Sequence, residues 1–236
     1  MAVKQKRVRK VLNSKIRQLY DIVADIDGLL TDMETDFYRV CIFGSARIAA
    51  DSPIYHQAEQ LAEGLARIGV DIVTGGGPGL MEAANKGAKA GSQGSWSIGL
   101  PIDLPFESDA NSHLDVKSQH RRFSSRLDEF MRITHAVVVV PGGIGTILEL
   151  FYTWQLMQVN HIKPRPVILL SADDTWTTFL SWLRDHPLKD ALMAERDFSM
   201  LQVVHSVDQV VRLLEPDIQR FRAANKLVGK GPADNT

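Results

Sequence analysis

The segment that most constrains the fold of this chain is a short apolar run that leads into a glycine-rich turn. The run, residues 135–140, is rich in valine, which is the composition of a strand buried on both faces. The turn reads Pro-Gly-Gly-Ile-Gly-Thr-Ile-Leu-Glu over residues 141–149, and the sequence from Thr146 to Met157 has the pattern of a helix. A buried strand, a tight turn and a helix in this order predict an α/β fold with an anion site at the turn.

The glycines of this turn allow the backbone to approach a phosphate group, and the free N–H groups of the first helical turn point toward it. The predicted phosphate contacts are Gly142, Gly143, Gly145 and Thr146. Glu149 follows Thr146 by three residues, which places a carboxylate one helical turn from the phosphate. The alternative is a structural turn in which Glu149 is only the capping-box partner of Thr146.

Strand-like and helix-like segments alternate along most of the chain. The predicted strands cover residues 40–43, 70–73, 96–100, 135–140, 166–170 and 200–204. Ser52 and Pro53 form an N-cap and first-turn pair that opens one helix, and Pro78 and Gly79 open a second that runs to about Ala90. This alternation predicts parallel strands joined by right-handed crossovers, and therefore a single α/β domain with a Rossmann-like, doubly wound parallel sheet.

Two more glycine-bearing turns follow predicted strands. Residues 75–82 read Gly-Gly-Gly-Pro-Gly-Leu-Met-Glu, and a Gly-Ser pair follows the first strand. Because the carboxyl ends of parallel strands lie along one edge of a sheet, we expect all three turns to form one pocket. The predicted ligand contacts in these two turns are Gly44, Ser45, Gly75, Gly76, Gly77, Gly79 and Glu82. The pattern is not the dinucleotide fingerprint Gly-x-Gly-x-x-Gly, which argues against a nicotinamide dehydrogenase.

Residues 119–132 predict an amphipathic helix just before the strand that leads to the turn at 141–149. Arg122 and Arg126 fall on neighbouring turns of one face of this helix. Two arginines aimed at a phosphate pocket supply forked, charge-assisted hydrogen bonds that lysine cannot imitate. The alternative is that both side chains are solvated.

Composition narrows the class of protein. The net charge of −1 lacks the excess of basic residues that is typical of nucleic-acid-binding proteins. Cys41 is the only cysteine, so it forms no intramolecular disulfide, and a buried thiol in a reducing compartment is its ordinary explanation. No apolar stretch is long enough to span a bilayer, and the basic first ten residues have no apolar segment behind them. We therefore expect a cytoplasmic protein that binds neither nucleic acid nor membrane.

The two glycine motifs, at 75–82 and 141–149, resemble those of the Lonely Guy (LOG) proteins, a family of cytokinin-activating nucleotide phosphoribohydrolases that is also labelled "lysine decarboxylase-like". The likeness runs from about Tyr38 to Leu170. It implies a Rossmann-like domain in which Arg126, aligned without a gap from Pro141, and Glu149 are the catalytic residues. It also implies a homodimer or higher homo-oligomer, with the site close to the interface, and no metal or other cofactor.

The sequence around Arg126 differs from the family pattern. Plant-type members read Met-His-x-Arg-Lys, whereas this chain has Phe-Ser-Ser-Arg-Leu over residues 123–127, and Glu82 stands where many members have glycine. The catalytic pair therefore carries over better than the identity of the substrate. Larger bacterial relatives that cleave ordinary purine and pyrimidine monophosphates have closely similar motifs.

The resemblance predicts hydrolysis of the N-glycosidic bond of a nucleoside 5′-monophosphate, AMP-like or a cytokinin nucleotide, to free base and ribose 5-phosphate. A non-catalytic carrier of nucleotide or molybdenum cofactor is the alternative. A lysine decarboxylase is disfavoured because no Ser-x-His-Lys anchor for pyridoxal phosphate is present. A purely structural protein has no use for glycines at three strand ends.

The chain is expected to divide into three regions. Residues 1–37 form an N-terminal helical extension, because apolar residues recur every three or four positions between Val8 and Asp36. Residues 38–224 form the Rossmann-like nucleotide-binding catalytic domain, and residues 225–236 form a flexible tail. The segment from Tyr152 to Met157 is apolar enough either for a subunit contact or for core packing.

Overall fold

The computed structural model describes residues 11–16, 19, 37–103 and 110–225 of the 236-residue chain. The chain divides into two compact units, Met1–Asp36 and Phe37–Thr236. In the first unit, residues 11–16 and residue 19 are helical, and their apolar side chains are exposed. The remainder of the predicted helix, and the predicted tail from residue 226, lie outside the described residues.

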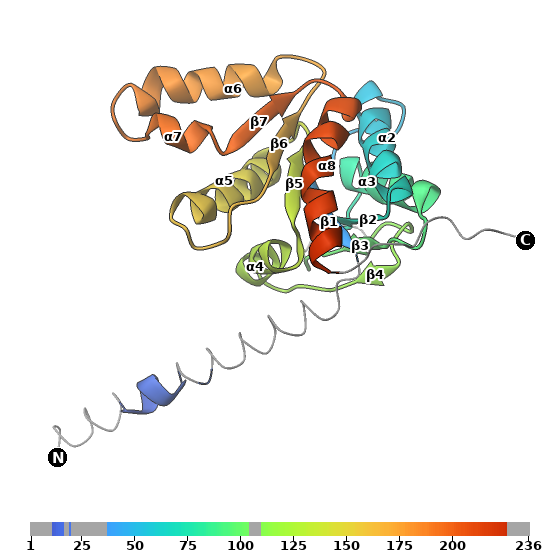
Figure 1. Ribbon diagram of the computed structural model, residues 1–236, viewed down its shortest axis with the longest axis horizontal. Coiled ribbons are helices and arrows are strands. Elements are labelled where there is room, and N and C mark those ends of the chain that lie inside the picture. The colour runs from blue at the N-terminus through green and yellow to red at the C-terminus, as the bar shows by residue number, and fades with distance from the viewer. Residues whose placement is uncertain (1–10, 17–18, 20–36, 104–109, 226–236) are drawn as a thin grey trace, which may run out of the picture. The chain divides into compact units, whose positions relative to one another are not determined.

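The second unit is built around a seven-stranded sheet in the order β4-β3-β2-β1-β5-β6-β7 (Figure 1). Every pairing between neighbouring strands is parallel. The strands are β1 (Tyr38–Phe43), β2 (Val70–Thr74), β3 (Ser97–Gly99), β4 (Val116–Lys117), β5 (Ala136–Val139), β6 (Val167–Leu170) and β7 (Leu201–Val204). The strand order reverses between β1 and β5, so the predicted Rossmann-like, doubly wound sheet is confirmed, and its switch point lies between these two strands.

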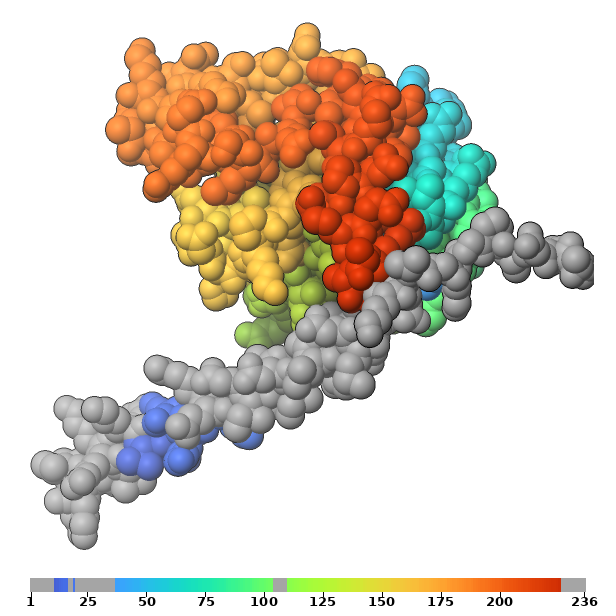
Figure 2. All heavy atoms as spheres, in the orientation of Figure 1, coloured from blue at the N-terminus to red at the C-terminus, as the bar shows by residue number. Residues whose placement is uncertain are grey.

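Helices cover both faces of the sheet. One face carries α2 (Pro53–Arg67), α3 (Leu80–Gly91) and α8 (Val207–Ala224). The other carries α4 (Phe123–Ile133), α5 (Ile144–Gln158), α6 (Thr175–Leu183), the π-helical turn η1 (Arg184–Leu188) and α7 (Glu195–Phe198). In the space-filling view, α8 and α2 lie side by side on the surface (Figure 2).

Successive residues of each strand face opposite layers, as the period of a strand requires. Val40 and Ile42 of β1 pack in the core under α2, α3 and α8, whereas Cys41 and Phe43 pack in the core under α4 and α5. Both faces of the central strands are therefore buried, which explains why β5 and β6 read as continuous apolar runs. No helix within the described residues is long and apolar enough to cross a membrane.

The main correction to the predicted elements concerns residues 119–132. Helix α4 begins only at Phe123, with Arg122 in an extended conformation at its N-cap. Residues before it continue the sheet instead, because His120 forms a parallel bridge with Ile102. The prediction that Arg122 and Arg126 lie on neighbouring helical turns is therefore wrong for Arg122. The two-residue strand β4 was not predicted.

Candidate active site

The two predicted catalytic residues meet at the carboxyl edge of the sheet. Arg126 lies in the first turn of α4, and Glu149 lies in the second turn of α5. Nη1 of Arg126 is 3.6 Å from Oε1 of Glu149, and the two side chains are only 11% and 13% exposed. A strand and a glycine-rich turn separate these residues in sequence, so the fold is what brings the ion pair together.

Backbone carbonyls at two strand ends hold Arg126 in place. Its Nε donates to the carbonyl of Leu100, just after β3, at 2.6 Å, and its Nη2 donates to the carbonyl of Gly75, just after β2, at 3.4 Å. The guanidinium also lies over the ring of Phe130, with Cζ 5.2 Å from the ring centroid. These contacts fix the plane of the guanidinium and direct Nη1 toward Glu149.

The pKa of Glu149 is shifted to neutrality. Burial raises it from its usual value near 4.5 to about 7, and the nearby charge of Arg126 acts in the opposite direction. A carboxylate with a pKa close to the working pH can change its protonation state during a reaction. A buried acid beside a fixed cation is the arrangement expected of a catalytic centre.

The glycine turn after β5 leaves room for a ligand at the N-terminus of α5. Gly143 is the N-cap of this helix, and the first helical hydrogen bond runs from the N–H of Ile147 to its carbonyl at 3.0 Å. The N–H groups of residues 144–146 precede that bond and are free to bind an anion. A Cβ atom added at Gly143 or Gly145 meets no atom within 4 Å, so packing does not require glycine at either position.

Thr146 and Gly142 pack together below this opening. Thr146 is buried, and a Cβ atom added at Gly142 lies 2.1 Å from its Oγ1. Gly142 is therefore required by packing within the protein. The alternative in which Thr146 and Glu149 form a capping box is wrong, because Thr146 is the third residue of α5 and not its N-cap.

Backbone hydrogen bonds join the three glycine-bearing turns to one another. The N–H of Ser45 donates to the carbonyl of Pro141 at 3.3 Å, and the carbonyl of Ser45 accepts the N–H of Leu80 at 2.9 Å. Gly79 has a φ of +66°, and a Cβ atom there lies 2.6 Å from the Ser45 carbonyl oxygen. The first turn therefore connects the other two, and only glycine at position 79 allows this close approach.

For two predicted ligand contacts, Glu82 and Arg122, the described residues show no side-chain contact with the ion pair. Glu82 faces α2, where burial and then the Glu82 charge raise the pKa of Tyr55. Arg122 is exposed at the N-cap of α4, and its carbonyl accepts the N–H of Arg126. No structural contact joins either side chain to Glu149 within the described residues, so their ligand roles remain predictions.

Sequence reasoning missed the residues that hold the turn after β2. Gly76 and Gly77 of this turn contact Asn111, which in turn bonds to Asn85 of α3. The available signal was an asparagine in an otherwise alanine-rich helix, a position where a polar side chain needs a buried partner.

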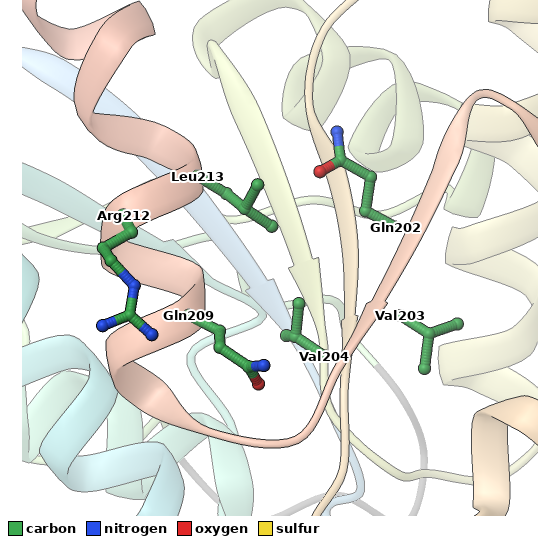
Figure 3. Close-up of a pocket in the computed structure, with 6 residues that line it drawn as sticks. All are labelled: Gln202, Val203, Val204, Gln209, Arg212 and Leu213. Atoms are coloured by element: carbon green, nitrogen blue, oxygen red, sulfur yellow. The ribbon is translucent and has the colours of Figure 1, made fainter.

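A hollow between β7 and α8 lies at the far edge of the sheet (Figure 3). It is lined by Gln202, Val203, Val204, Gln209, Arg212 and Leu213, none of which was predicted as a site residue. In the part of the chain that the structure describes, no three or more His, Cys, Asp or Glu side chains gather as a metal site.

The model of the family described as "possible lysine decarboxylase" matches residues 81–214, which is more than half of the chain. The chain belongs to this family. It is the LOG family predicted from the glycine motifs, and the matched range contains both Arg126 and Glu149.

The LOG-family relatives are distant, and two of those with the higher identities are matched over only part of their own length. The probable cytokinin riboside 5′-monophosphate phosphoribohydrolase LOGL5 of Oryza sativa subsp. japonica is 30% identical over 155 residues, which are 62% of this chain and 59% of that protein. The pyrimidine/purine nucleotide 5′-monophosphate nucleosidase of Escherichia coli K12 is 32% identical over 124 residues, which are 49% of this chain and 27% of that protein. This chain therefore spans well under two thirds of either relative.

Solved structures share the fold. The molybdenum cofactor binding protein of Rippkaea orientalis superposes with a TM-score of 0.57 over 78% of this chain and 99% of that protein, at 21% identity. At this identity the likeness shows the fold of the LOG-family domain and nothing about its ligand.

Proposed function

We propose that this protein hydrolyses the N-glycosidic bond of a nucleoside 5′-monophosphate and releases a free base and ribose 5-phosphate. The observation that carries the proposal is the buried pair of Arg126 and Glu149, 3.6 Å apart, next to a glycine turn with open space at Gly143 and Gly145. The relatives named for phosphoribohydrolase and nucleosidase activity support it.

The 5′-phosphate binds at the N-terminus of α5 in this proposal. The free N–H groups of Ile144, Gly145 and Thr146 and the dipole of the helix favour an anion there. The phosphate is remote from the bond that breaks, so its binding energy orients the sugar.

Glu149 acts on the ribose. Cleavage of an N-glycosidic bond passes through a state with positive charge at the anomeric carbon, as in other glycoside hydrolyses. The Glu149 carboxylate stabilises that charge, hydrogen-bonds the ribose hydroxyls and orients the attacking water. The reaction needs the ionised form, which the pKa near 7 makes available at neutral pH.

Arg126 positions the nucleotide and assists the departure of the base. The carbonyls of Leu100 and Gly75 hold it, so its guanidinium needs little reorganisation when substrate binds. The cation in this site is an arginine, which does not form the imine that pyridoxal phosphate chemistry requires. The geometry therefore disfavours the decarboxylation that the family description names.

The test is release of free base from AMP, GMP, CMP and a cytokinin riboside 5′-monophosphate by the wild type and by Glu149→Gln. The proposal expects base and ribose 5-phosphate from at least one nucleotide, with release abolished by the substitution. Release of inorganic phosphate, or tight binding without turnover, contradicts it. Binding without turnover supports the carrier alternative.

We propose that the protein is a homodimer or higher homo-oligomer that uses the exposed face of α5. Ile144, Leu148 and Phe151 are 90%, 44% and 37% exposed and recur at the spacing of one helix face. Trp154 and Met157 are buried in the core, so core packing accounts for most of the segment 152–157. The contact surface is therefore the first half of α5.

We also propose a cytoplasmic location, because the proposed substrates are intracellular metabolites. Fractionation of cells that produce the tagged protein tests this directly. Recovery with the membrane or secreted fraction contradicts it.

A further inference from the structure

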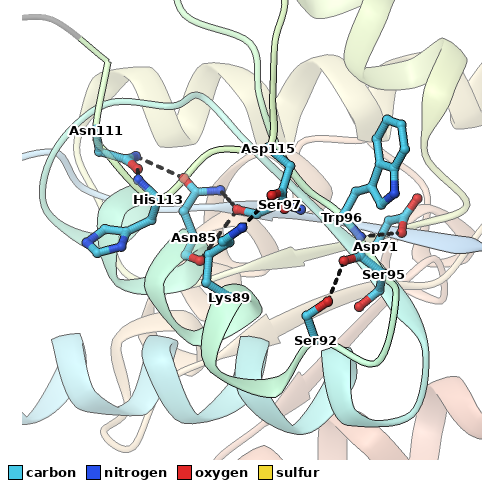
Figure 4. A network of polar contacts seen from close by, with 10 residues as sticks. All are labelled: Asp71, Asn85, Lys89, Ser92, Ser95, Trp96, Ser97, Asn111, His113 and Asp115. Carbon is cyan, nitrogen blue, oxygen red and sulfur yellow. Dashed lines mark hydrogen bonds and ion pairs between the residues drawn. The ribbon is translucent and has the colours of Figure 1, made fainter.

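A network of amides and hydroxyls supports the glycine turn after β2. Figure 4 shows the part of this network in which Asn85 contacts Asn111 and Ser97. Asn85 of α3 is fully buried, and its Oδ1 accepts from Thr74 Oγ1 at 2.6 Å and from Asn111 Nδ2 at 2.9 Å. Its Nδ2 donates to Ser97 Oγ of β3 at 2.9 Å. The network thus connects β2, β3 and α3 with the segment that precedes β4.

The network also binds the turn itself. The N–H of Asn111 donates to the carbonyl of Gly76 at 2.8 Å, and its Nδ2 donates to the carbonyl of Gly77 at 3.0 Å. On the other side of the turn, the N–H of Gly76 donates to Thr74 Oγ1 at 2.9 Å. Asn111 and Thr74 therefore hold successive peptide groups of the turn between them.

These bonds set the direction of the Gly77 N–H. In a planar trans peptide the N–H points opposite to the carbonyl. The Gly76 carbonyl faces Asn111, so the N–H of the same peptide, which belongs to Gly77, points away from Asn111. Gly77 is partly exposed, and its N–H has no acceptor among the described residues.

The turn borders the catalytic pair. The carbonyl of Gly75 accepts Nη2 of Arg126, whose Nη1 faces Glu149. A ligand whose ribose contacts Glu149 therefore lies beside this turn.

A largely buried polar network costs free energy in desolvation that an apolar core avoids, and it specifies one geometry in return. Here each of the two side-chain groups of Asn85 has a partner, and Oδ1 of Asn111 accepts the N–H of His113 at 3.1 Å. The geometry that is specified is that of residues 75–77.

We infer that Asn111, anchored by Asn85, and Thr74 are positioning residues that hold the turn at 75–77 so that the Gly77 N–H donates to the ribose 5-phosphate part of the ligand. This inference rests on the proposed function for the identity of the ligand. None of these three side chains takes part in bond cleavage.

The experiment measures the Kd of ribose 5-phosphate by calorimetry for the wild type and for Asn111→Ser. Serine keeps an oxygen for the His113 N–H and removes both bonds made by Nδ2. We expect the Kd to rise about tenfold, the change expected for loss of one well-placed hydrogen bond. With a cleavable nucleotide, KM rises similarly while kcat changes less than about twofold.

A second pair of variants tests the hydrogen bond between Thr74 and the turn. Thr74→Val removes the hydroxyl that holds the Gly76 N–H and is expected to weaken ribose 5-phosphate binding, whereas Thr74→Ser keeps the hydroxyl and retains affinity. Ser95→Ala is the matched control, because it removes a buried hydroxyl at the opposite end of β3, where Ser95 Oγ donates to the carbonyl of Ala66.

Circular dichroism and thermal unfolding confirm that each variant is folded. An unchanged Kd in both folded Asn111→Ser and folded Thr74→Val overturns the inference, as does a loss of binding no larger than that of Ser95→Ala. If the wild type binds ribose 5-phosphate and cleaves no nucleotide, the proposed function fails while the Kd comparison still tests the positioning role.

Discussion

The guanidinium of Arg126 lies 3.6 Å from the carboxylate of Glu149, and both groups are withdrawn from water. Burial raises the pKa of Glu149 to about 7 against the opposing effect of the arginine. The carbonyls of Leu100 and Gly75 hold the arginine from behind, so the pair is fixed before a substrate arrives. The protonation of Glu149, the free energy that its burial costs and the geometry of Arg126 each lead to a measurable consequence.

The first prediction concerns pH and rate. If the Glu149 carboxylate is the active form, kcat/KM for the preferred nucleotide falls about tenfold per pH unit below pH 7 and is level above it. A pH–rate profile of the wild type measures this. Glu129→Gln is the matched control, because that glutamate is paired with Arg132 on the outer part of α4 and its loss should leave the profile unchanged. A profile that is flat from pH 5 to 8 contradicts the assignment.

The second prediction concerns stability. The pKa of Glu149 is raised in the folded protein, so the native state binds its proton more tightly than the unfolded chain does, and stability falls as pH rises from about 4.5 to about 7. A shift of this size corresponds to a cost of about 3 kcal/mol above pH 7. Glu149→Gln is therefore expected to be more stable than the wild type at pH 8 and not at pH 4.5.

Urea unfolding of both proteins at the two pH values measures this difference as a shift of the midpoint. A Glu149→Gln variant that is less stable than the wild type at pH 8 shows that the Arg126 contact outweighs the cost of burial. That result contradicts the raised pKa.

The third prediction concerns the geometry of the arginine. Lysine keeps the charge of Arg126 but presents no planar fork, so it cannot contact the Leu100 carbonyl, the Gly75 carbonyl and Glu149 together. Arg126→Lys is expected to lower kcat/KM at least about 100-fold, which is typical of losing one fixed electrostatic group in an active site. Arg132→Lys on the same helix is the control. Steady-state kinetics that do not distinguish the two variants contradict the proposed role.

Much of the fold follows from the sequence because the sheet is buried on both faces. Most of the strands then read as largely apolar runs, and glycine turns mark where β1, β2 and β5 end. Arg126 and Glu149 could also be predicted as a catalytic pair, because Glu149 belongs to the motif at 141–149 and Arg126 aligns upstream of it with the arginine of the LOG family. Local patterns and one motif were sufficient for these features.

The rest depends on contacts between segments far apart in the chain. The periodicity of residues 119–132 suits a helix, but the bridge between His120 and Ile102 keeps the first residues extended. Asn111 lies 26 residues from its partner Asn85 in a segment without a regular pattern. The bridge leaves no signal in a single sequence, and Asn85 in an alanine-rich helix signals only that a partner exists and not which residue it is, because tertiary contacts override local preference.

The fourth prediction concerns the surface of α5. Leu148 is 44% exposed in the middle of the apolar face proposed as a subunit contact. Leu148→Arg is expected to convert the oligomer to a monomer, because an unpaired charge in an apolar interface is not tolerated. Leu213→Arg on α8, which is 37% exposed in the wild type, is the matched control and should keep the oligomer. Sedimentation measures the oligomeric state of the two variants. If Leu148→Arg remains oligomeric, the subunit contact lies elsewhere.

The last prediction compares a glycine next to the proposed phosphate site with a glycine in another helix. Gly145 of α5 and Gly64 of α2 are both helical, and an added Cβ atom meets nothing within 4 Å at either position. Alanine at each is expected to stabilise the fold by about 0.5–1 kcal/mol, because glycine is a poor helix former. Only Gly145→Ala is expected to raise the KM for nucleotide, by about tenfold or more, since its methyl group occupies the space next to the proposed phosphate. Thermal unfolding and kinetics of the two variants test this, and equal KM values mean that the phosphate does not bind at the N-terminus of α5.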